Sequence, residues 1–382
     1  MTLIRITAYA TALAFFTTAV LPVEAQRRKK KDEKATQTLE VLPEPPSVIS
    51  AETARLELVT VPMSAKGLLS QQVRDGLRTL IRDTKKAPII KIRAFVAGTG
   101  DMRRVSAIVS EELTDKKMPL PVVSVVQVGA LPMDGAQVQL EAITLNRRAV
   151  NPNGLAFLSG QAVTREGPLQ TRVLPLASES LTNLRKAVEA AGTTPADVLR
   201  LSCFMSSLED VADVRSAAGR LFPAAMTLFL QTQRAPAQTV VECEGVARLK
   251  TKPSSAVVFL NPPGLPASKA YSQVALVAAP QLVLAGSQLA FRYTEDDARL
   301  AFQRLEKTLN SGNSSLKQAV FVNTYPLSSL LMEMVRKVRF DFLDPARPPA
   351  STMLPFEGLP SMDGAFALEV VALPNSTSSP NP

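Results

Sequence analysis

Hydrophobic and polar residues recur with two different periods along this chain, and the two periods follow one another in a fixed order. The order is clearest in the last third, where strand-like alternation precedes a helical spacing that places Ala298, Phe302 and Leu305 on one face. The predicted elements there are strands at 271–277 and 282–290, a helix at 295–309, a strand at 319–325, a helix at 328–343 and two closing strands. This segment therefore predicts a ββαβαββ unit.

The same order of elements occurs twice more, upstream. The middle copy predicts a strand at 155–163, a helix at 178–191 that Gly192 ends, a strand at 198–205, a helix beginning at Ser207 and closing strands from 223 and at 239–249. The first copy predicts a strand at 55–62, a helix at 70–83, a strand at 89–97, a helix that Asp101 caps and closing strands within 122–143. Three tandem modules account for this repetition.

The closing strands carry the plainest repeat. ALPMDGAQVQLEAI spans residues 130–143, and GLPSMDGAFALEVVAL spans residues 358–373. In both, Leu-Pro and Asp-Gly supply turn residues, and the apolar residues that follow alternate with polar ones. We therefore expect a β-hairpin to close the first and third modules.

Each predicted sheet carries both of its helices on one face, so its other apolar face needs a cover. Three such sheets packed around an axis would bury these faces against one another. The expected fold is α+β, with three tandem ββαβαββ modules packed as an intrachain pseudo-trimer. Because the three-fold packing is already satisfied within the chain, we expect a monomer in solution.

The two ends of the chain differ from the modules in composition. Arg5 precedes an apolar run at 8–21 that is short for a bilayer span, and a small-residue cleavage site ends at Ala25. We therefore expect an exported protein, periplasmic or secreted, with an uncleaved membrane anchor as the alternative. The expected boundaries are a signal peptide at 1–25, a basic, Pro-containing linker at 26–53, modules at 54–146, 147–252 and 265–374, a linker at 253–264 and a disordered tail at 375–382.

Composition narrows the possible chemistry. The chain has no His and two Cys, which excludes Ser-His-Asp and Cys-His nucleophiles and argues against His or thiolate metal sites, so we expect neither a metal nor a cofactor. Five basic residues at 27–31 supply more than half of the net charge of +9. The folded body is thus only mildly basic, and we expect no specific nucleic-acid binding. The basic run either contacts an anionic surface or is simply solvated.

Several of these segments together resemble a known family. They are Asn-Gly-Leu-Ala-Phe-Leu-Ser-Gly-Gln at 153–161, the first helix ending in Gly, Tyr-Ser-Gln at 271–273 and the Leu-Pro closing segment with its Glu strand. They are similar to the RidA/YjgF family of imine and enamine deaminases, also called endoribonuclease L-PSP. The resemblance implies chorismate-mutase-like subunits that form homotrimers with ligand clefts between subunits, so three modules in one chain would form the trimer internally.

The resemblance also implies where ligand-binding residues should lie. The family's carboxylate-binding arginine follows Pro-Ala at the start of the penultimate strand, and a glutamate on the last strand positions water or moves protons. The arginine position falls on Val123, Ala225 and Ser351 in the three copies, and the glutamate position on Gln139, Glu242 and Ala367. No copy therefore keeps the arginine, and only the middle copy keeps the glutamate.

The remaining candidate ligand-binding residues are those that match the family's motif. They are Glu242, Tyr271, Ser159, Gly160 and Gln288. The alternatives are that Glu242 faces solvent and that Tyr271 only packs at a module edge. Arg234, Arg292 and Arg347 could replace the missing arginine in space, or could be solvated surface residues.

The two cysteines, Cys203 and Cys243, both fall on predicted strands of the middle module. The resemblance implies that these strands are neighbours, which favours a disulfide in an exported protein. A pair of small buried apolar side chains is the alternative. A catalytic thiol is disfavoured, because no His is present to activate it.

Four functions remain open at this stage. The first is a small-molecule binder or pseudoenzyme with an unidentified ligand, which the loss of the arginine favours. The second is a working enamine or imine deaminase, and the third is a protein-interaction scaffold. RNA cleavage is the weakest of the four, because the chain lacks His and its folded body is only mildly basic.

Overall fold

The structure is a computed structural model that describes residues 41–375. The predicted signal peptide, the basic run and all but the first residue of the predicted tail lie outside the described residues. Within 41–375 no helix combines the length and apolar character that crossing a bilayer requires.

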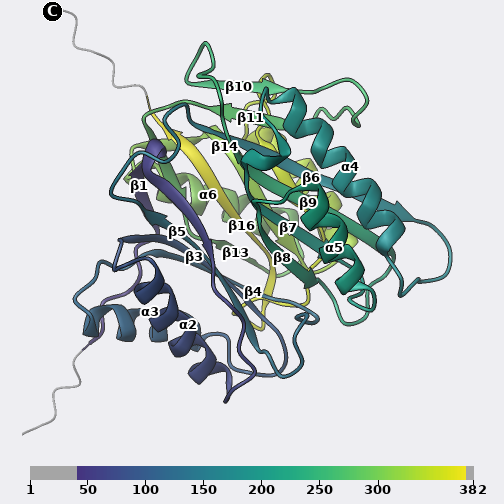
Figure 1. Ribbon diagram of the computed structural model, residues 1–382. Coiled ribbons are helices and arrows are strands. Elements are labelled where there is room, and N and C mark those ends of the chain that lie inside the picture. Colours follow the sequence, from purple (N-terminus) through teal and green to yellow (C-terminus); the bar gives the residue numbers. More distant parts are fainter. Residues whose placement is uncertain (1–40, 376–382) are drawn as a thin grey trace, which may run out of the picture. The chain divides into compact units, whose positions relative to one another are not determined.

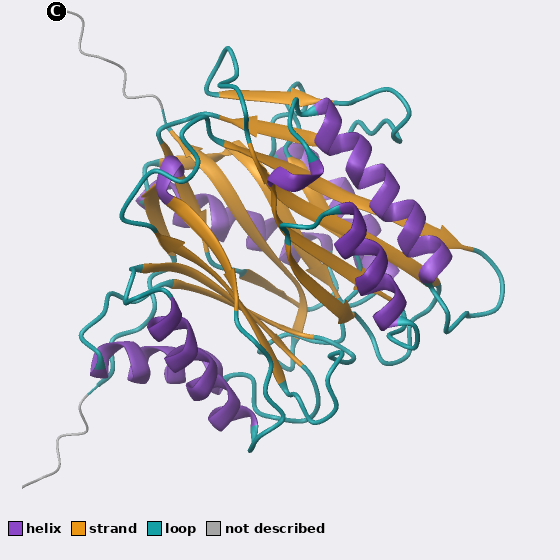
Figure 2. Cartoon of the chain, in the orientation of Figure 1, coloured by secondary structure: helices purple, strands orange, loops and turns teal. Residues whose placement is uncertain are grey.

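The described chain forms three β-sheets, each with its own helices (Figures 1 and 2). The first contains β2 (Leu56–Thr60), β5 (Val138–Leu145), β3 (Ile89–Val96) and β4 (Val122–Gln127), with α2 (Leu69–Asp83) and α3 (Arg104–Asp115). The second contains β10 (Val257–Leu260), β11 (Val274–Val277), β6 (Leu155–Arg165), β9 (Thr239–Arg248), β7 (Val198–Met205) and β8 (Met226–Gln231), with α4 (Leu174–Ala190) and α5 (Val211–Leu221). The third contains β1 (Val48–Glu52), β12 (Gln281–Ala285), β16 (Gly364–Pro374), β14 (Ser314–Pro326) and β15 (Ala350–Met353), with β13 (Gln288–Phe291) also on β16, and with α6 (Glu295–Ser311) and α7 (Ser329–Val338). Three short 3-10 helices complete the set: η1 (Thr53–Arg55), η2 (Pro195–Asp197) and η3 (Arg339–Asp341).

The three sheets share one internal order. In each, the last strand of the module lies antiparallel to the middle strand, whose other side pairs in parallel with the penultimate strand. These trios are β5-β3-β4, β9-β7-β8 and β16-β14-β15. The expected α+β fold class is confirmed, and the sequence repeat corresponds to a repeated strand order.

The predicted hairpins at the closing strands are wrong. β4 and β5 do not pair with each other, because β3 lies between them, and β14 separates β15 from β16 in the same way. The turn-rich segment therefore crosses over the end of the middle strand. Turn residues and alternation predict two strands and a reversal of direction, but a third strand can still enter between them.

Strand partners also differ from the prediction at 271–290. β11 pairs with β6 of the second sheet, whereas β12 pairs with β1 and β16 of the third. β1 and β10 come from segments predicted as linkers, 26–53 and 253–264. Gly154 lets β11 come close, since a Cβ at this position would lie 2.0 Å from the carbonyl oxygen of Val277. Strands thus cross between modules and extend sheets that would otherwise end sooner.

Two predicted helix caps are also wrong. α3 begins at Arg104, and the carboxylate of Asp101 accepts a hydrogen bond from the N–H of Arg103 instead of capping the helix. α5 begins at Val211, three residues later than a Ser207 cap requires. The carboxylate of Asp210 accepts hydrogen bonds from the N–H groups of Val173 and Leu174 and so caps the neighbouring helix α4.

Each sheet buries both faces. One face packs on its own helices and forms a separate apolar core. The opposite faces of all three sheets meet in two further apolar clusters, one around Phe157 and Phe321 and the other around Phe95, Phe204 and Phe356. Burial on both sides explains why the middle strands β3 and β7 are almost continuously buried.

Charged side chains lie between these two apolar clusters. We call them the central ion cluster; its members are Lys91, Arg93, Glu141, Arg200, Glu244 and Glu369, all at most 5% exposed. Arg93 Nη2 lies 2.9 Å from Glu141 Oε2 and 3.3 Å from Glu244 Oε1. Lys91 Nζ lies 2.8 Å from Glu369 Oε2, and Arg200 Nη1 lies 2.6 Å from Glu141 Oε1. Three cations and three carboxylates therefore balance in the interior.

The segments between penultimate and last strands join the modules at one end of the sheets. The N–H of Gln127 donates to the carbonyl of Gly358, and Gly129 donates to the carbonyl of Gln231. Arg234 Nε lies 2.8 Å from Glu357 Oε1. The duplicated Leu-Pro segment thus has a structural role, because it holds neighbouring modules together.

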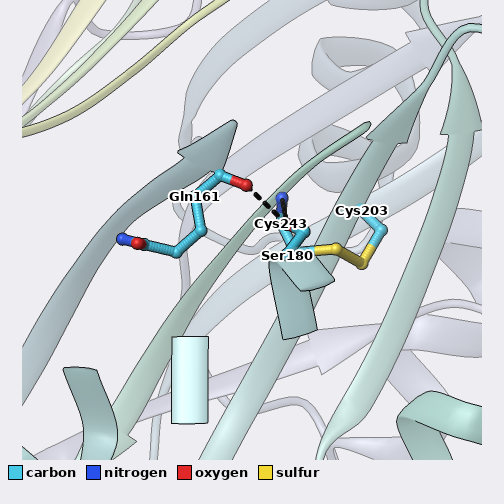
Figure 3. Close-up of a disulfide and its surroundings, with 4 residues drawn as sticks. All are labelled: Gln161, Ser180, Cys203 and Cys243. Carbon is cyan, nitrogen blue, oxygen red and sulfur yellow. Dashed lines mark hydrogen bonds between the residues drawn. A yellow bond between two sulfur atoms is a disulfide. The ribbon is translucent and has the colours of Figure 1, made fainter. Parts of the chain in front are cut away.

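Cys203 and Cys243 form a disulfide, so the first of the two sequence interpretations holds (Figure 3). They lie opposite each other on β7 and β9, with their Cα atoms 4.1 Å apart. Ser180 of α4 lies beside the disulfide, where its hydroxyl accepts from the N–H of Cys243 and donates to the carbonyl of Gln161 (Figure 3). The serine thereby satisfies two backbone groups where the β6–β9 register shifts.

Replacing Glu369 by Gln should strongly destabilise the fold, because the ammonium of Lys91 would stay buried without its carboxylate. We expect the free energy of unfolding in urea to fall by about 3–5 kcal/mol near neutral pH. The Glu369 pKa is lowered to about 2, because the charges of Lys91 and Arg93 outweigh the cost of burial. The stabilisation is therefore fully present above the usual glutamate pKa and is lost as pH falls below it, through about 2.

The matched control is Glu189→Gln, which removes an exposed pair with Arg185 at 3.7 Å. It should change the free energy of unfolding by less than about 1 kcal/mol. Equal effects of the two substitutions would contradict a central role for the cluster.

Candidate functional site

Two of the three positions that correspond to the family's arginine, Ser351 and Val123, lie where one sheet meets the next. Ser351 on β15 faces the second sheet, and its N–H donates to Ser159 Oγ on β6 at 2.8 Å. The carbonyl oxygen of Val123 on β4 faces the third sheet, where a Cβ at Gly286 would lie 3.2 Å from it, while the Val123 side chain packs against the core of the first module. Ala225, just before β8, packs against the core of the second module. If the chain has a ligand site like that of the family, we expect it at such a junction between sheets.

Four of the five predicted ligand-binding residues come together at one junction. Ser159 bridges the two sheets, because its hydroxyl also donates to the carbonyl of Ser272 at 2.6 Å. Gly160 lies directly against Glu242, and a Cβ at this position would come within 1.8 Å of Glu242 Oε1. Glycine is thus required for this carboxyl group to fit. We call the set of Ser159, Gly160, Glu242, Tyr271 and Ser351 the β6–β15 junction.

The fifth predicted residue, Gln288, does not join them. It lies at the start of β13 and lines a groove next to Val123, at the junction of the first and third sheets. Gln288 therefore lies beside the arginine position of the first module, in a different module pair from the other four.

Glu242 is buried rather than exposed to solvent, so the solvent-facing alternative is wrong. It is 5% exposed and lies opposite Phe204 in the sheet, between Val241 and the disulfide-bonded Cys243. Burial raises the Glu242 pKa to about 8, and the charge of Glu244 adds to this, while the backbone of Met353 and the charge of Arg336 partly oppose it. At neutral pH most of this carboxyl group is therefore protonated and uncharged.

Tyr271 is half-buried at the edge of the same junction. Its neighbour Ser272 donates backbone and side-chain hydrogen bonds to the carbonyls of Pro349 and Pro348, next to β15. Burial raises the Tyr271 pKa, and the Glu242 carboxylate raises it further. The tyrosine is therefore both packed at a module edge and close to the buried glutamate.

Arg339 was not identified from the sequence. It lies in η3, directly after α7, and is 3% exposed. Its Nη2 atom is buried without a hydrogen-bond partner among residues 41–375. Burial lowers the Arg339 pKa to about 10, the nearby charge of Arg336 lowers it further, and Tyr271 opposes them. The guanidinium remains charged at neutral pH, and a buried charge is costly unless it is paired.

The three arginines named as candidates to replace the missing one each pair with a carboxylate. Arg234 pairs with Glu357 at 2.8 Å, Arg292 with Asp297 at 3.2 Å and Arg347 with Asp344 at 3.3 Å. A signal for Arg339 was present in the sequence, because it continues the spacing of the apolar residues Leu331 and Val335 on the buried face of the helix. A charged residue on an apolar stripe is a candidate for function.

The junction therefore combines donors, an uncharged acid and a buried cation. The hydroxyl of Ser351 is also buried without a partner in the described chain. Buried polar groups without partners are unusual in folded proteins, so the Ser351 hydroxyl and Arg339 Nη2 each point to a missing partner. A group that accepts hydrogen bonds and carries negative charge would satisfy them.

The other two junctions lack such groups at the corresponding positions. Ala367 occupies the glutamate position in the third module. Gln139 in the first donates to the carbonyls of Val61 and Leu140 and so has a structural role. Within 41–375 no cluster of three or more His, Cys, Asp or Glu side chains could hold a metal ion.

Replacing Glu242 by Gln should stabilise the protein at alkaline pH. Because the pKa is raised to about 8 in the folded state, the glutamate's contribution is fully present below the usual glutamate pKa and is lost as pH rises through about 8. The amide cannot ionise, so Glu242→Gln should raise the midpoint of thermal unfolding at about pH 9 and change it little at about pH 5. Glu209→Gln, at an exposed site, is the control and should show no such pH dependence.

Residues 139–252 match the family described as Endoribonuclease L-PSP. No curated protein matches the chain. Among solved structures, a Rid family protein, YyfB from Yersinia pestis, is 13% identical over 31% of this chain and 99% of its own, with a TM-score of 0.29.

Two further solved structures match the same share of the chain. Rv2704 from Mycobacterium tuberculosis, a member of the YjgF/YER057c/UK114 family, is 18% identical over 31% of this chain and 98% of its own, with a TM-score of 0.22. NMB1025 from Neisseria meningitidis, a YjgF family member, is 11% identical over 31% of this chain and 94% of its own, with a TM-score of 0.23. Residues 139–252 are thus similar to the endoribonuclease L-PSP family, the family that the sequence motifs resemble.

Proposed function

We propose that the chain is an exported RidA-like protein that binds a small carboxylate-bearing molecule at the β6–β15 junction. The observation that carries the proposal is the buried guanidinium of Arg339, whose Nη2 has no partner in the described chain. The expectation of export rests on the apolar segment after Arg5.

The charges at the junction favour an anion. Glu242 is mostly uncharged at neutral pH and therefore does not neutralise Arg339. Arg336 also lies nearby, where it pairs with Glu333. A carboxylate would pair with a guanidinium through charge-assisted hydrogen bonds, each worth about 1.5–3 kcal/mol.

The surrounding groups would orient such a ligand. The hydroxyl of Ser351 can donate a hydrogen bond, and the protonated Glu242 can donate one as well. Tyr271 and Arg336 are partly exposed, so they mark the side from which a small molecule would enter. In this arrangement the carboxylate is held from η3 rather than from the penultimate strand.

Arg339→Gln should weaken binding of pyruvate, used as a minimal carboxylate probe. We expect a loss of about ten- to a hundredfold in affinity by calorimetry, because a charge-assisted contact is removed. In the unmodified protein, binding should also weaken as pH rises above about 8, since ionised Glu242 would repel the anion.

Two controls belong to this measurement. Arg347→Gln removes an exposed arginine that pairs with Asp344, and it should bind pyruvate as well as the unmodified protein. Glu242→Gln should abolish the decline in affinity at alkaline pH. Unchanged affinity in Arg339→Gln would refute the proposed site.

Enamine or imine hydrolysis is a second candidate function, favoured by the Glu242 pKa of about 8. A carboxyl group that titrates near neutral pH can both donate and accept a proton during turnover. Hydrolysis of 2-aminoacrylate requires protonation at carbon, addition of water to the resulting imine and release of ammonia, leaving pyruvate.

If the chain is an enzyme, the protein that begins at Gln26 should form pyruvate from 2-aminoacrylate faster than the uncatalysed reaction in buffer. The Glu242→Gln variant should form pyruvate no faster than the uncatalysed reaction. The measurement is the initial rate with 2-aminoacrylate generated in situ. A Ser351→Arg variant tests the family's arginine position. Binding of pyruvate without turnover in the unmodified chain would identify a binder that has lost catalysis.

A further inference from the structure

A groove lies at the junction between the first and third sheets. It encloses about 400 Å³, within the range of roughly 300–1,000 Å³ that is usual for small-molecule sites. Its walls are the segment 42–47, α3, β4 and the residues at the start of β13. We call it the β4–β13 groove.

The groove is the counterpart of the β6–β15 junction, but its chemistry differs. Val123 occupies the position that Ser351 occupies in the third module. The lining also contains the hydroxyl groups of Ser106, Ser110 and Ser287 and the side-chain amide of Gln288. Glu44 is the one charged residue in the lining, and no Lys or Arg contributes to it.

The walls of the groove are fixed by backbone contacts. The N–H of Gly286 donates to the carbonyl of Ser47 at 2.9 Å, and the N–H of Ser287 donates to Ser124 Oγ at 3.1 Å. A Cβ at Gly286 would lie 3.1 Å from Val122 Cγ1, so glycine permits the close approach of the third sheet to β4. The groove is therefore a built part of the junction between the sheets.

One buried polar atom in the lining lacks a partner. Ser110 is 2% exposed, and its Oγ forms no hydrogen bond within residues 41–375. A serine in the middle of a helix commonly donates to the carbonyl four residues earlier, which this one does not do. A ligand hydroxyl or carbonyl in the groove would satisfy it.

We propose that the β4–β13 groove binds an uncharged small molecule that carries hydroxyl and amide groups, of the class of N-acetylated amino sugars. Serine hydroxyls and the Gln288 amide can both donate and accept hydrogen bonds, which suits a ligand with the same groups. Val123 and the prolines of the 42–47 segment supply apolar surface for a methyl group or a sugar face. With no Lys or Arg in the lining, an anion has nothing to pair with.

Saturation-transfer NMR with N-acetylglucosamine tests this proposal on the chain from Gln26. We expect transfer to the acetyl and ring protons of the probe at concentrations of about 10 mM or below, which corresponds to weak but specific binding. Ser110→Ala should weaken binding about two- to tenfold through the loss of one hydrogen bond. Ser106→Trp should abolish it, because the indole would fill the groove.

Thr114→Trp is the matched control. It places the same side chain on an exposed position of α3 outside the groove lining, and it should leave binding unchanged. The chain contains no Trp, so each of the two Trp variants carries a single indole, and the far-UV circular dichroism of all three variants checks that they are folded.

The proposal would be overturned if no saturation transfer to N-acetylglucosamine were seen at this concentration, or if transfer persisted in Ser106→Trp. Stronger transfer to pyruvate than to N-acetylglucosamine, unaffected by Arg339→Gln, would show that the groove takes anions and would also overturn it. This inference does not depend on the proposed function, since Arg339→Gln should leave binding of the sugar unchanged.

Discussion

Three buried cations and three buried carboxylates meet where the three sheets face one another, and the rest of the structure depends on their balance. Removing such charges from water is costly, so each must find its partner in the interior. Several of the pairs join different modules: Arg200 of the second pairs with Glu141 of the first, and Lys91 of the first pairs with Glu369 of the third. The cluster therefore fixes which module packs against which, beyond what the surrounding apolar surfaces would specify.

The charged residues of the central ion cluster are distributed unequally among the modules. The first supplies two cations and one carboxylate, the second one of each, and the third a carboxylate alone. Phe321 and Asn323 occupy the positions in β14 that correspond to Lys91 and Arg93 in β3. Three copies of the first or the third module would leave like charges buried together. The three junctions, having become unequal, are free to differ in chemistry, as the cationic β6–β15 junction and the neutral β4–β13 groove do.

Local pattern predicted the elements of the modules well, because the period of hydrophobic residues reflects which face of each element is buried. The strand containing Cys203 and the helix ended by Gly192 were predicted within a few residues. The partners of the strands were not predictable in this way. Pairing of β11 with β6 depends on contacts between segments more than one hundred residues apart, and nothing in the alternation of 271–277 distinguishes one partner from another.

The candidate site was predictable to the extent that its residues belong to a motif. Glu242, Ser159 and Gly160 were identified because they keep the family's residue types, and the structure brings them together. Arg339 was missed because it belongs to no such motif and comes from a segment expected only to pack. Its burial without a partner is a property of the folded chain, and the position of one Arg on an apolar helix face gave the only hint in the sequence.

Because strands pair across modules, some strands near the start of the described chain can pair only after distant segments have been synthesised. Val48 pairs with Ala285, 237 positions later, so the first strand of the described chain finds its partner only after most of the protein has been synthesised. Until then β1 has an unpaired edge, which is a hazard for association with other chains. Pro43, Pro45 and Pro46 stand immediately before it and cannot donate backbone hydrogen bonds. These prolines therefore limit the association of β1 with other chains before β12 is available to pair with it.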